Sequence, residues 1–164
     1  MLIRDAAEGD FESIVRLNSE SEQFLNSQAS LTVDDLRLLH DSASYHRVAT
    51  IDGTVAGFVL AFRSGTPHRD PNYLWFSSRF SDFLYVDRII VSNAARGKGV
   101  GKLLYNDLFS WARASKVSRV TCEIDCDPPN EVSSQFHSGF GFREVGRHKV
   151  DDGKKTVSLQ EAQL

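Results

Sequence analysis

The chain has 164 residues, of which 41% are hydrophobic and 25% are charged, and its formal net charge is −3. This length and composition fit one globular domain with a substantial core. The acidic balance, with a pI of about 5.9, argues against a basic surface for nucleic acid or anionic lipid. The opening MLIRDAAEGDFESIV argues against a secretory signal, and no apolar run is long enough for a membrane span.

The first part of the chain predicts a strand, two helices and a β-hairpin. LIRDA is typical of a short strand, and residues 9–18 place apolar side chains near helical spacing. Thr32 and Asp35 have the spacing of a cap at the start of a second helix. The run YHRVATIDGTVAGFVLAFR then has two strand-like halves that meet at Asp52-Gly53, a strong hairpin signal.

The remainder predicts a loop followed by alternating strands and helices. Residues 64–81 contain Pro67 and Pro71 and predict a long loop, of a length that is often functional. The elements after it are a strand over 83–91, a helix over 99–115, a strand over 119–126, a short helix over 130–139, and strands over 140–150 and 156–160. This order predicts an α/β (α+β) single domain of residues 1–164, with a mixed sheet of about seven strands and about four helices.

The stretch RGKGVGK, residues 96–102, lies between a predicted strand and a predicted helix, which is where phosphate-binding loops occur. The P-loop pattern G-x-x-x-x-G-K-[ST] fails, because Arg96 stands where its first glycine is required and Leu103 follows Lys102. The dinucleotide pattern G-x-G-x-x-G also fails, since the chain has G-x-G-x-G, far from its first strand.

A third pattern, [QR]-x-x-G-x-[GA], is matched by Arg96, Gly99 and Gly101, and here the chain resembles the GNAT superfamily of GCN5-related N-acetyltransferases. A second stretch, NEVSSQFHSGFGF, resembles the family pattern N-x-x-[AS]-x-x-[FL]-[YH]-x-x-x-G-F. Its matching residues are Asn130, Ser133, Phe136, His137, Gly141 and Phe142. The preceding VTCEI resembles the fifth strand of that family, so the similarity covers residues 83–145.

The resemblance implies an enzyme that transfers the acetyl group of acetyl-CoA to a primary amine of a small molecule or peptide, by direct attack in a ternary complex and without a metal. It assigns the coenzyme pyrophosphate to the loop Arg96, Gly97, Lys98, Gly99, Val100, Gly101 and Lys102. It assigns the pantetheine arm and thioester carbonyl to the main chain of Ile89, Ile90 and Val91, with Asn130, Ser133 and Phe136 beside them. For Asn130, a helix N-cap is an equally good interpretation.

Acetyl transfer needs a group that accepts the amine proton and one that protonates the departing thiolate. Asp87 is the first candidate base, and an ion pair with Arg88 is its structural alternative. Glu123 is the second candidate base, and a water-relayed base is a further possibility. His137 stands where many family members have a tyrosine acid, although a packed histidine is the commoner situation.

Other patterns leave alternatives open. The aromatic residues of PNYLWFSSRFSDFLY fit an acceptor pocket, an ordinary core or a dimer contact. The polar residues Glu20, Ser21 and Glu22 fit either an amine-attracting surface or a solvated helix.

Cys122 and Cys126 predict two unbridged thiols and hence a cytoplasmic protein. A homodimer involving the C-terminal strand is possible. The rival functions are a non-catalytic acyl-CoA-binding or sensing module and a protein-interaction domain.

Overall fold

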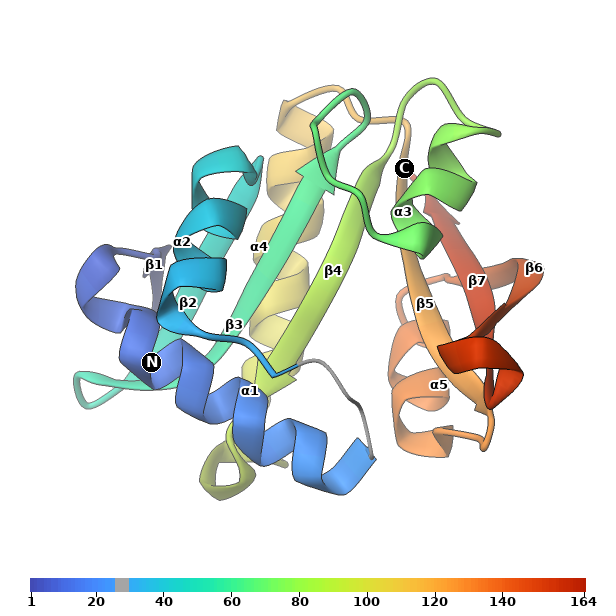
Figure 1. The fold of residues 1–164 in the computed structure, drawn as a ribbon. Helices are drawn as coiled ribbons and strands as arrows, with labels where there is room; N and C mark the ends of the chain where they lie inside the picture. Colours follow the sequence, from blue (N-terminus) through green and yellow to red (C-terminus); the bar gives the residue numbers. More distant parts are fainter. Residues whose placement is uncertain (26–29) are drawn as a thin grey trace. The chain divides into compact units, whose positions relative to one another are not determined.

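The computed structural model describes the backbone of residues 1–25 and 30–164, and the side chains of all of these except 22–25 (Figure 1). Within this part there are seven strands and five α-helices. They are β1 (Leu2–Asp5), α1 (Phe11–Leu25), α2 (Val33–Ser42), β2 (Tyr45–Ile51), β3 (Thr54–Arg63), α3 (Pro71–Ser77), β4 (Leu84–Val91), α4 (Val100–Ala114), β5 (Arg119–Asp127), α5 (Glu131–Ser138), β6 (Arg143–Val150) and β7 (Lys155–Gln163).

The strands form a sheet in the order β1-β2-β3-β4-β5-β7-β6. The pairing of β4 with β5 is parallel, at Leu84–Val120 and Tyr85–Thr121, whereas β7 is antiparallel to both β5 and β6. The predicted mixed seven-stranded α/β fold is therefore confirmed. Because β7 has partners on both sides, the C-terminal strand is interior, and β6 is the edge strand at that end of the sheet.

The chain divides into two compact units, each made of two segments. Unit 1 comprises residues 1–62 and 87–111, and unit 2 comprises residues 63–86 and 112–164. Strand β4 contributes its first three residues to unit 2 and its last five to unit 1.

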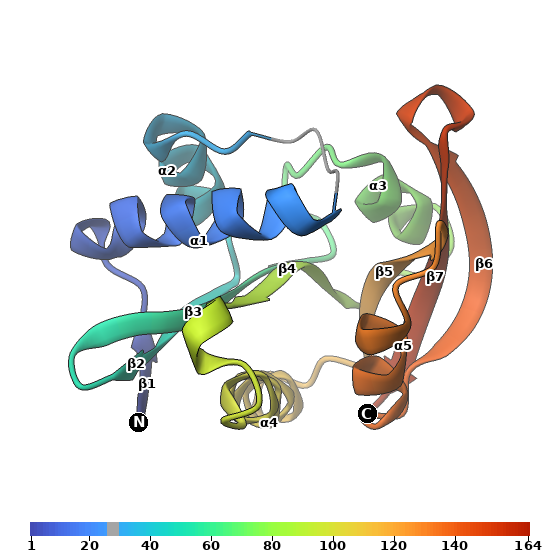
Figure 2. The ribbon, with the colours of Figure 1, turned by 90° about the horizontal axis from the view of Figure 1, so that it is seen from below.

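In unit 1, α1 and α2 cover one face of the strands and α4 covers the other (Figure 2). The apolar side chains of the two helices meet those of β2 and β3 in a core that includes Phe11, Ile14, Leu36, Val48 and Phe58. Helix α1 extends beyond its predicted end at residue 18, because polar residues on its solvent side do not interrupt helical spacing. Glu20 and Ser21, two of the three residues that fit an amine-attracting surface or a solvated helix, are half-buried near the end of α1. The side chain of the third, Glu22, lies outside the described residues.

The β2–β3 hairpin turns where the Asp-Gly pair predicts it. Asp52 has φ +50° and Gly53 has φ +80°, as a two-residue type I′ turn requires, and Ile51 pairs with Thr54 across it. The helix α2 likewise begins at the predicted cap, where the Thr32 hydroxyl accepts the Asp35 N–H at 3.1 Å.

Unit 2 contains a helix that the sequence analysis did not predict, since α3 lies within the segment expected to be a loop. The Asp70 carboxylate accepts the N–H groups of Asn72 (2.8 Å) and Tyr73 (3.2 Å), and Pro71 occupies the first helical position. An Asp-Pro pair is a helix start signal for this reason, because proline lacks only an N–H that the first turn cannot use. The two prolines of the segment therefore mark its helix rather than exclude one.

Most of the aromatic residues after Asp70 form the core of unit 2. Tyr73, Phe76 and Phe83 are buried, with ring centroids 5.4–6.2 Å apart in the Tyr73–Phe83 and Phe76–Phe83 pairs. Trp75 is half-buried against Gly146 of β6, and the guanidinium carbon of Arg79 lies 3.6 Å from the centre of its ring. For the buried members, the interpretation as ordinary core is the one that the structure supports.

Candidate active site

The glycine-rich loop of unit 1 follows β4 directly and leads into α4. After Val91 a short turn over Asn93–Ala95 precedes residues 96–99, which form a turn of exposed residues, and α4 begins at Val100. Gly97 and Gly99 have φ values of +75° and +81°, in the left-handed region that favours glycine. A Cβ added at either position would meet no atom within 4 Å, so the requirement for glycine is conformational and the space beside the loop is open.

The start of α4 directs backbone N–H groups towards this loop. The N–H of Leu103 bonds to the Gly99 carbonyl at 2.9 Å, which closes the first helical turn. The N–H groups of Val100, Gly101 and Lys102 precede that bond and have no acceptor within a helix of this geometry. Together with the helix dipole and the exposed side chains of Lys98 and Lys102, they make the loop a suitable binding surface for phosphate groups.

The end of β4 is held close to β3 by a glycine. A Cβ at Gly57 would lie 2.8 Å from the Ile90 carbonyl oxygen and 3.1 Å from Val100 Cγ1. The adjacent Ser92 N–H donates to the Ala56 carbonyl at 2.8 Å. Ile89, Ile90 and Val91, the predicted coenzyme-binding backbone, thus lie on a strand whose position depends on close packing at Gly57.

Asp87, the first candidate base, is in an ion pair. Its side chain is 6% exposed, and Arg88 Nε donates to its Oδ2 at 2.7 Å. Arg88 in turn donates from a terminal nitrogen to Oδ1 of the buried Asn18 on α1, at 2.7 Å. This is the ion pair that the structural alternative for Asp87 predicted, and it anchors β4 to α1.

In unit 2, the second motif provides the N-cap of α5, the whole helix and the turn that follows it, up to Phe142. The Asn130 side-chain oxygen accepts the Ser133 N–H at 3.1 Å, so the N-cap interpretation of Asn130 is confirmed. Its side-chain NH₂ group is a separate donor that the cap does not use. Ser133 and Phe136 are half-buried on the same helix.

His137 is buried on α5, between the rings of Phe136 and Phe142 at centroid distances of 5.4 and 5.2 Å. Its Nδ1 lies 2.7 Å from the Ser133 carbonyl oxygen. Because a carbonyl only accepts, Nδ1 has the hydrogen, and the neutral ring presents Nε2 without one. Burial lowers the pKa of His137, although the bond to Ser133 opposes this effect. The geometry therefore favours a packed, neutral His137 over a proton donor.

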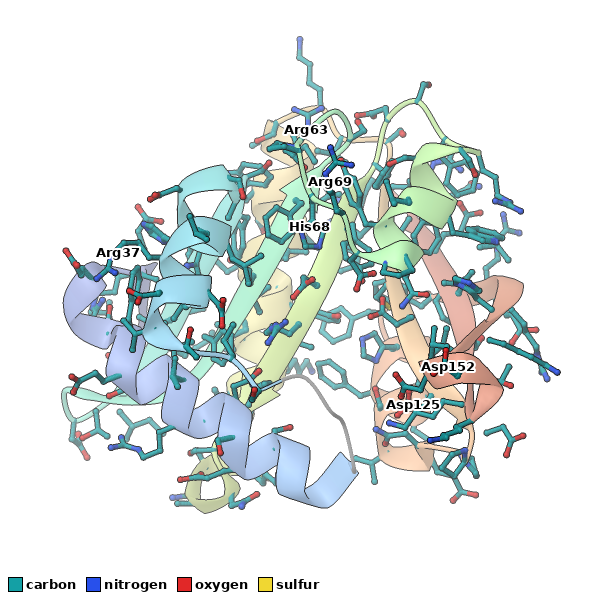
Figure 3. The ribbon with its side chains drawn as sticks, in the orientation of Figure 1. Arg37, Arg63, His68, Arg69, Asp125 and Asp152 are labelled. Atoms are coloured by element: carbon teal, nitrogen blue, oxygen red, sulfur yellow. The ribbon has the colours of Figure 1, made fainter. Side chains whose placement is uncertain are left out.

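Glu123, the second candidate base, contacts a buried phenol. The Tyr85 hydroxyl lies 2.8 Å from Glu123 Oε2 and 3.1 Å from Asp70 Oδ1, and Tyr85 is fully buried. The ring of His68 lies beside that of Tyr85, with centroids 5.9 Å apart, and Figure 3 shows His68 and Arg69 on the segment that leads into α3. The sequence analysis did not identify Tyr85 or Asp70. The Asp-Pro signal could have indicated Asp70, whereas Tyr85 has the pattern of any core strand residue.

A curated protein is similar to about two thirds of this chain. Phosphinothricin N-acetyltransferase of Streptomyces coelicolor is 39% identical over 113 residues, which are 68% of this chain and 60% of that protein. The match thus spans less than two thirds of the length of this relative.

Solved structures share the fold at lower identity. Ard1 from Thermoplasma volcanium has a TM-score of 0.80 at 19% identity, covering 99% of this chain and 97% of that one. Ribosomal-protein-alanine N-acetyltransferase from Brucella melitensis has a TM-score of 0.76 at 20% identity, covering both chains in full. The yncA protein of Salmonella typhimurium, solved with its cofactor acetyl-CoA, has a TM-score of 0.74 at 19% identity, covering 100% of this chain and 94% of that one.

The decisive match is to a family model. The model described as the acetyltransferase (GNAT) family matches residues 11–142, a range that includes β4, the glycine loop, α4, β5 and α5. Both sequence motifs fall inside this range, in agreement with the resemblance that they indicated. The chain belongs to the acetyltransferase (GNAT) family of enzymes.

Proposed function

We propose that residues 1–164 act as one N-acetyltransferase domain, which transfers the acetyl group of acetyl-CoA to a primary amine of a small molecule or peptide by direct attack in a ternary complex. The observation that carries this proposal is the loop at the start of α4, which has left-handed Gly97 and Gly99 and the exposed side chains of Lys98 and Lys102. Its donors and positive charges suit the anionic phosphates of coenzyme A.

The coenzyme would be held at three places. The main-chain N–H groups of residues 97–102 would bind the pyrophosphate, with Arg96, Lys98 and Lys102 supplying charge. The backbone of Ile89, Ile90 and Val91 would pair with the pantetheine arm as an added strand does, and one of its N–H groups would polarise the thioester carbonyl. The side-chain NH₂ of Asn130, which the helix cap does not use, would contact the arm as well, together with Ser133 and Phe136 on α5.

The thioester supplies the acyl group, and the residues of the chain supply orientation and proton transfer. An alkyl ammonium must lose a proton before it attacks, and either carboxylate, Asp87 or Glu123, or a water bound to one of them, would accept it. With its Nδ1 hydrogen held by Ser133, His137 would protonate the thiolate only as an imidazolium, which burial disfavours. We therefore assign His137 chiefly to the packing of α5.

The acceptor that we would test first is phosphinothricin, since a phosphinothricin N-acetyltransferase is 39% identical to this chain. A short peptide with a free N-terminus is the matched comparison for the peptide alternative.

Two unbridged thiols, Cys122 and Cys126, support a cytoplasmic location. If the protein is a homodimer, a strand-to-strand contact would use β6 rather than the interior β7. No helix in the described part of the chain is long and apolar enough to cross a membrane.

Thermal unfolding with acetyl-CoA, CoA or ATP tests the coenzyme site. A ligand at one hundred times its Kd stabilises the native state by about 2.7 kcal/mol, which corresponds to about 5–10 °C for a chain of this size. We expect both coenzymes to raise the Tm and ATP to leave it nearly unchanged. Gly99→Glu should abolish the response, because it changes the loop conformation and adds negative charge.

Gly53→Glu is the matched control for Gly99→Glu. Gly53 has nearly the same φ, +80° against +81°, and an equally open surrounding, but it lies in the β2–β3 turn. The control should unfold at a lower temperature than the wild type and still respond to CoA. Absence of any coenzyme response in the wild type would contradict the proposal and favour the interaction-domain alternative. A CoA response without thiol release from acetyl-CoA, across phosphinothricin, amino acids and the peptide, would favour the sensing module.

A further inference from the structure

Two histidines of unit 1 face each other across the junction of α2 and β2. The Nδ1 atom of His40, on α2, lies 2.8 Å from the Nδ1 atom of His46, on β2. Phe11 packs against both rings, and Phe58 of β3 lies against His46 with 6.3 Å between ring centroids. His46 is buried and His40 is half-buried, so this contact joins the helix to the strand beside the apolar core.

The short distance between the two nitrogens means that they share one hydrogen. Two facing lone pairs, or two facing N–H groups, would repel each other, and a neutral imidazole has a single N–H group. Two arrangements satisfy this condition. In the first, His46 donates from Nδ1 and has a bare Nε2, while His40 has its hydrogen on Nε2. In the second, His40 donates from Nδ1, and the hydrogen of His46 is on Nε2.

The surroundings of His46 Nε2 favour the first arrangement. This atom is buried and, within the described residues, has no hydrogen-bond partner. A buried N–H group without an acceptor is tolerated less well than a buried acceptor without a donor. The shared hydrogen of the neutral pair is therefore on His46 Nδ1, and the other hydrogen is on Nε2 of the half-buried His40.

This arrangement leaves no good position for an added proton. On His40 the proton would occupy Nδ1, where it would oppose the N–H of His46. The rings could then stay together only if His46 moved its hydrogen to Nε2, which has no acceptor. On His46 Nε2 the proton would place a charge in the core, which is costly without a partner. Burial, and then the neighbouring His40, accordingly lower the pKa of His46 from 6.5 to about 4.

Charged groups near the pair keep their charge while the pH falls to about 4. Asp10, whose charge acts on the His46 ring, is held by Arg4 through bonds of 2.6 and 2.8 Å, and these bonds lower the pKa of Asp10 from 3.8. Hydrogen bonds from Thr32 lower the pKa of Asp35, at the start of α2, in the same way. The other charged groups on α2 or bonded to it are Glu8, Asp34, Arg37 and Asp41.

We propose that His40 and His46 form a proton-sensitive latch, which holds α2 against β2 while both rings are neutral and releases the helix when a proton enters. On release the rings separate, water reaches both nitrogens of His46, and one N–H bond forms with a proton from solvent. Return of the helix expels that proton. The latch is a property of unit 1 alone and does not depend on acetyl transfer.

The proton makes release easier in acid, because the open state binds it and the closed state does not. The pKa of His46 is 6.5 when the ring is exposed and about 4 when the latch is closed. Between these two pH values the equilibrium constant for opening should rise about tenfold per pH unit, and about 300-fold in all, on account of His46. Above pH 6.5 it should be constant.

Hydrogen exchange followed by NMR at several pH values tests the latch. Protection factors, corrected for the intrinsic pH dependence of exchange, are compared for the amides of α2 and α4, which cover opposite faces of the same strands (Figure 2). We expect α2 to be less protected than α4 at every pH, because it opens locally, and its protection to fall about tenfold per pH unit below 6.5.

Two results of this measurement would overturn the latch. Equal protection of α2 and α4 would mean that α2 opens only when the whole unit unfolds. Lower protection of α2 without a dependence on pH would mean that the helix opens while the two rings stay together.

His46→Phe and His40→Gln show which ring takes the proton. His46→Phe keeps a ring beside Phe11 and removes the titrating group, so the pH dependence of α2 protection should vanish. In His40→Gln the side-chain oxygen can accept the His46 Nδ1 hydrogen, and His46 still takes a proton on release, so the dependence should remain. The opposite pattern in the two variants would contradict the assignment to His46.

Glu8→Gln is the matched control for the other anchor of α2. It removes the charge of an exposed carboxylate that accepts from Arg37 at 2.6 Å. The pH dependence of α2 protection should stay as in the wild type. Its loss in Glu8→Gln would assign the acid sensitivity to this ion pair and overturn the latch.

Nitrogen-15 NMR of the imidazole rings tests the closed state separately. The signals of His40 and His46 are identified by their loss in the two histidine variants. Near neutral pH we expect the hydrogen of His46 on Nδ1 and that of His40 on Nε2, and His46 should keep its tautomer in His40→Gln. A wild-type His46 with its hydrogen on Nε2 would overturn the arrangement on which the latch depends. If either variant does not fold, the wild-type protection of α2 and α4 still decides the proposal.

Discussion

At the scale of single residues, burial has a larger effect than neighbouring charge on the pKa of His46. His40 on α2 and His46 on β2 face each other through Nδ1 atoms 2.8 Å apart, and Phe11 packs against both rings. His46 is buried, and within the described structure its Nε2 has no hydrogen-bond partner. Burial, and then the neighbouring His40, lower the pKa of His46 to about 4. The ring is therefore neutral throughout the physiological range.

This histidine should make the protein less stable in acid. The unfolded chain has a His46 pKa of 6.5, so between pH 6.5 and about 4 it binds more protons than the folded chain. The free energy of unfolding should then fall by about 3 kcal/mol across this window on account of His46. His46→Phe should flatten the slope, as measured by urea denaturation at several pH values.

The comparison for that experiment is His148→Gln, which changes a half-buried histidine on β6 that bonds to Asn72. This variant should keep the slope of the wild type between pH 6.5 and 4. Equal slopes in all three proteins would mean that groups other than His46 cause the acid sensitivity.

At the scale of elements, Gly57 determines how closely β3, β4 and α4 approach one another. A methyl group there would meet the Ile90 carbonyl oxygen at 2.8 Å, Val100 Cγ1 at 3.1 Å and Leu104 Cδ1 at 3.3 Å. A backbone carbonyl cannot move aside as a side chain can. The strand that would bind the pantetheine arm and the helix that would bind the pyrophosphate are therefore positioned by the same contact.

We expect Gly57→Ala to lower the free energy of unfolding by about 1–3 kcal/mol, the usual cost of overpacking a core. Because β4 and the start of α4 must shift together, the variant should also lose affinity for CoA, which isothermal titration would measure. Gly9→Ala provides the comparison, since a Cβ at Gly9 meets nothing within 4 Å. Stability and CoA affinity equal to those of Gly9→Ala would show that the strands accommodate the methyl group without moving.

The elements also show what could be predicted from the sequence. Local signals were sufficient for the Asp52-Gly53 turn, the Thr32 cap and the position of the glycine-rich loop before α4, because each depends on a few adjacent residues. The order β5-β7-β6 could not be predicted, since it depends on contacts between distant segments. Helix α3 is not predicted when Pro67 and Pro71 are considered only for their helix-breaking effect, because Pro71 occupies the first helical position, where proline is favourable. The contact of Tyr85 with Asp70 and Glu123 joins three separate segments, and no pattern in the sequence indicates it.

At the scale of the whole molecule, neither compact unit is a continuous piece of chain. Each consists of two segments, and the chain passes from one unit to the other three times. One of these passages lies inside β4, which pairs with β5 at Tyr85 and contacts Gly57 through Ile90. Loss of either unit would therefore remove the partners of part of this one strand.

We accordingly expect one cooperative unfolding transition, with equal calorimetric and van't Hoff enthalpies in differential scanning calorimetry. Acetyl-CoA should move the entire transition to higher temperature. Two resolved transitions, of which the coenzyme moves only one, would show that the units unfold independently. The variant Gly53→Glu should lower the midpoint without splitting the peak, because the β2–β3 turn lies within unit 1.

The two cysteines have a consequence for how turnover can be measured. Burial raises the pKa of the Cys122 thiol well above its ordinary value, and the half-buried Cys126 donates its thiol hydrogen to the Thr156 carbonyl at 3.3 Å. Since thiol reagents react with thiolates, the buried Cys122 should consume little of a colorimetric reagent such as a disulfide dye. Even the unfolded chain can release only two equivalents of colour. A signal that exceeds two equivalents per chain therefore comes from coenzyme A, and so the protein can serve in a continuous assay without removal of its own cysteines.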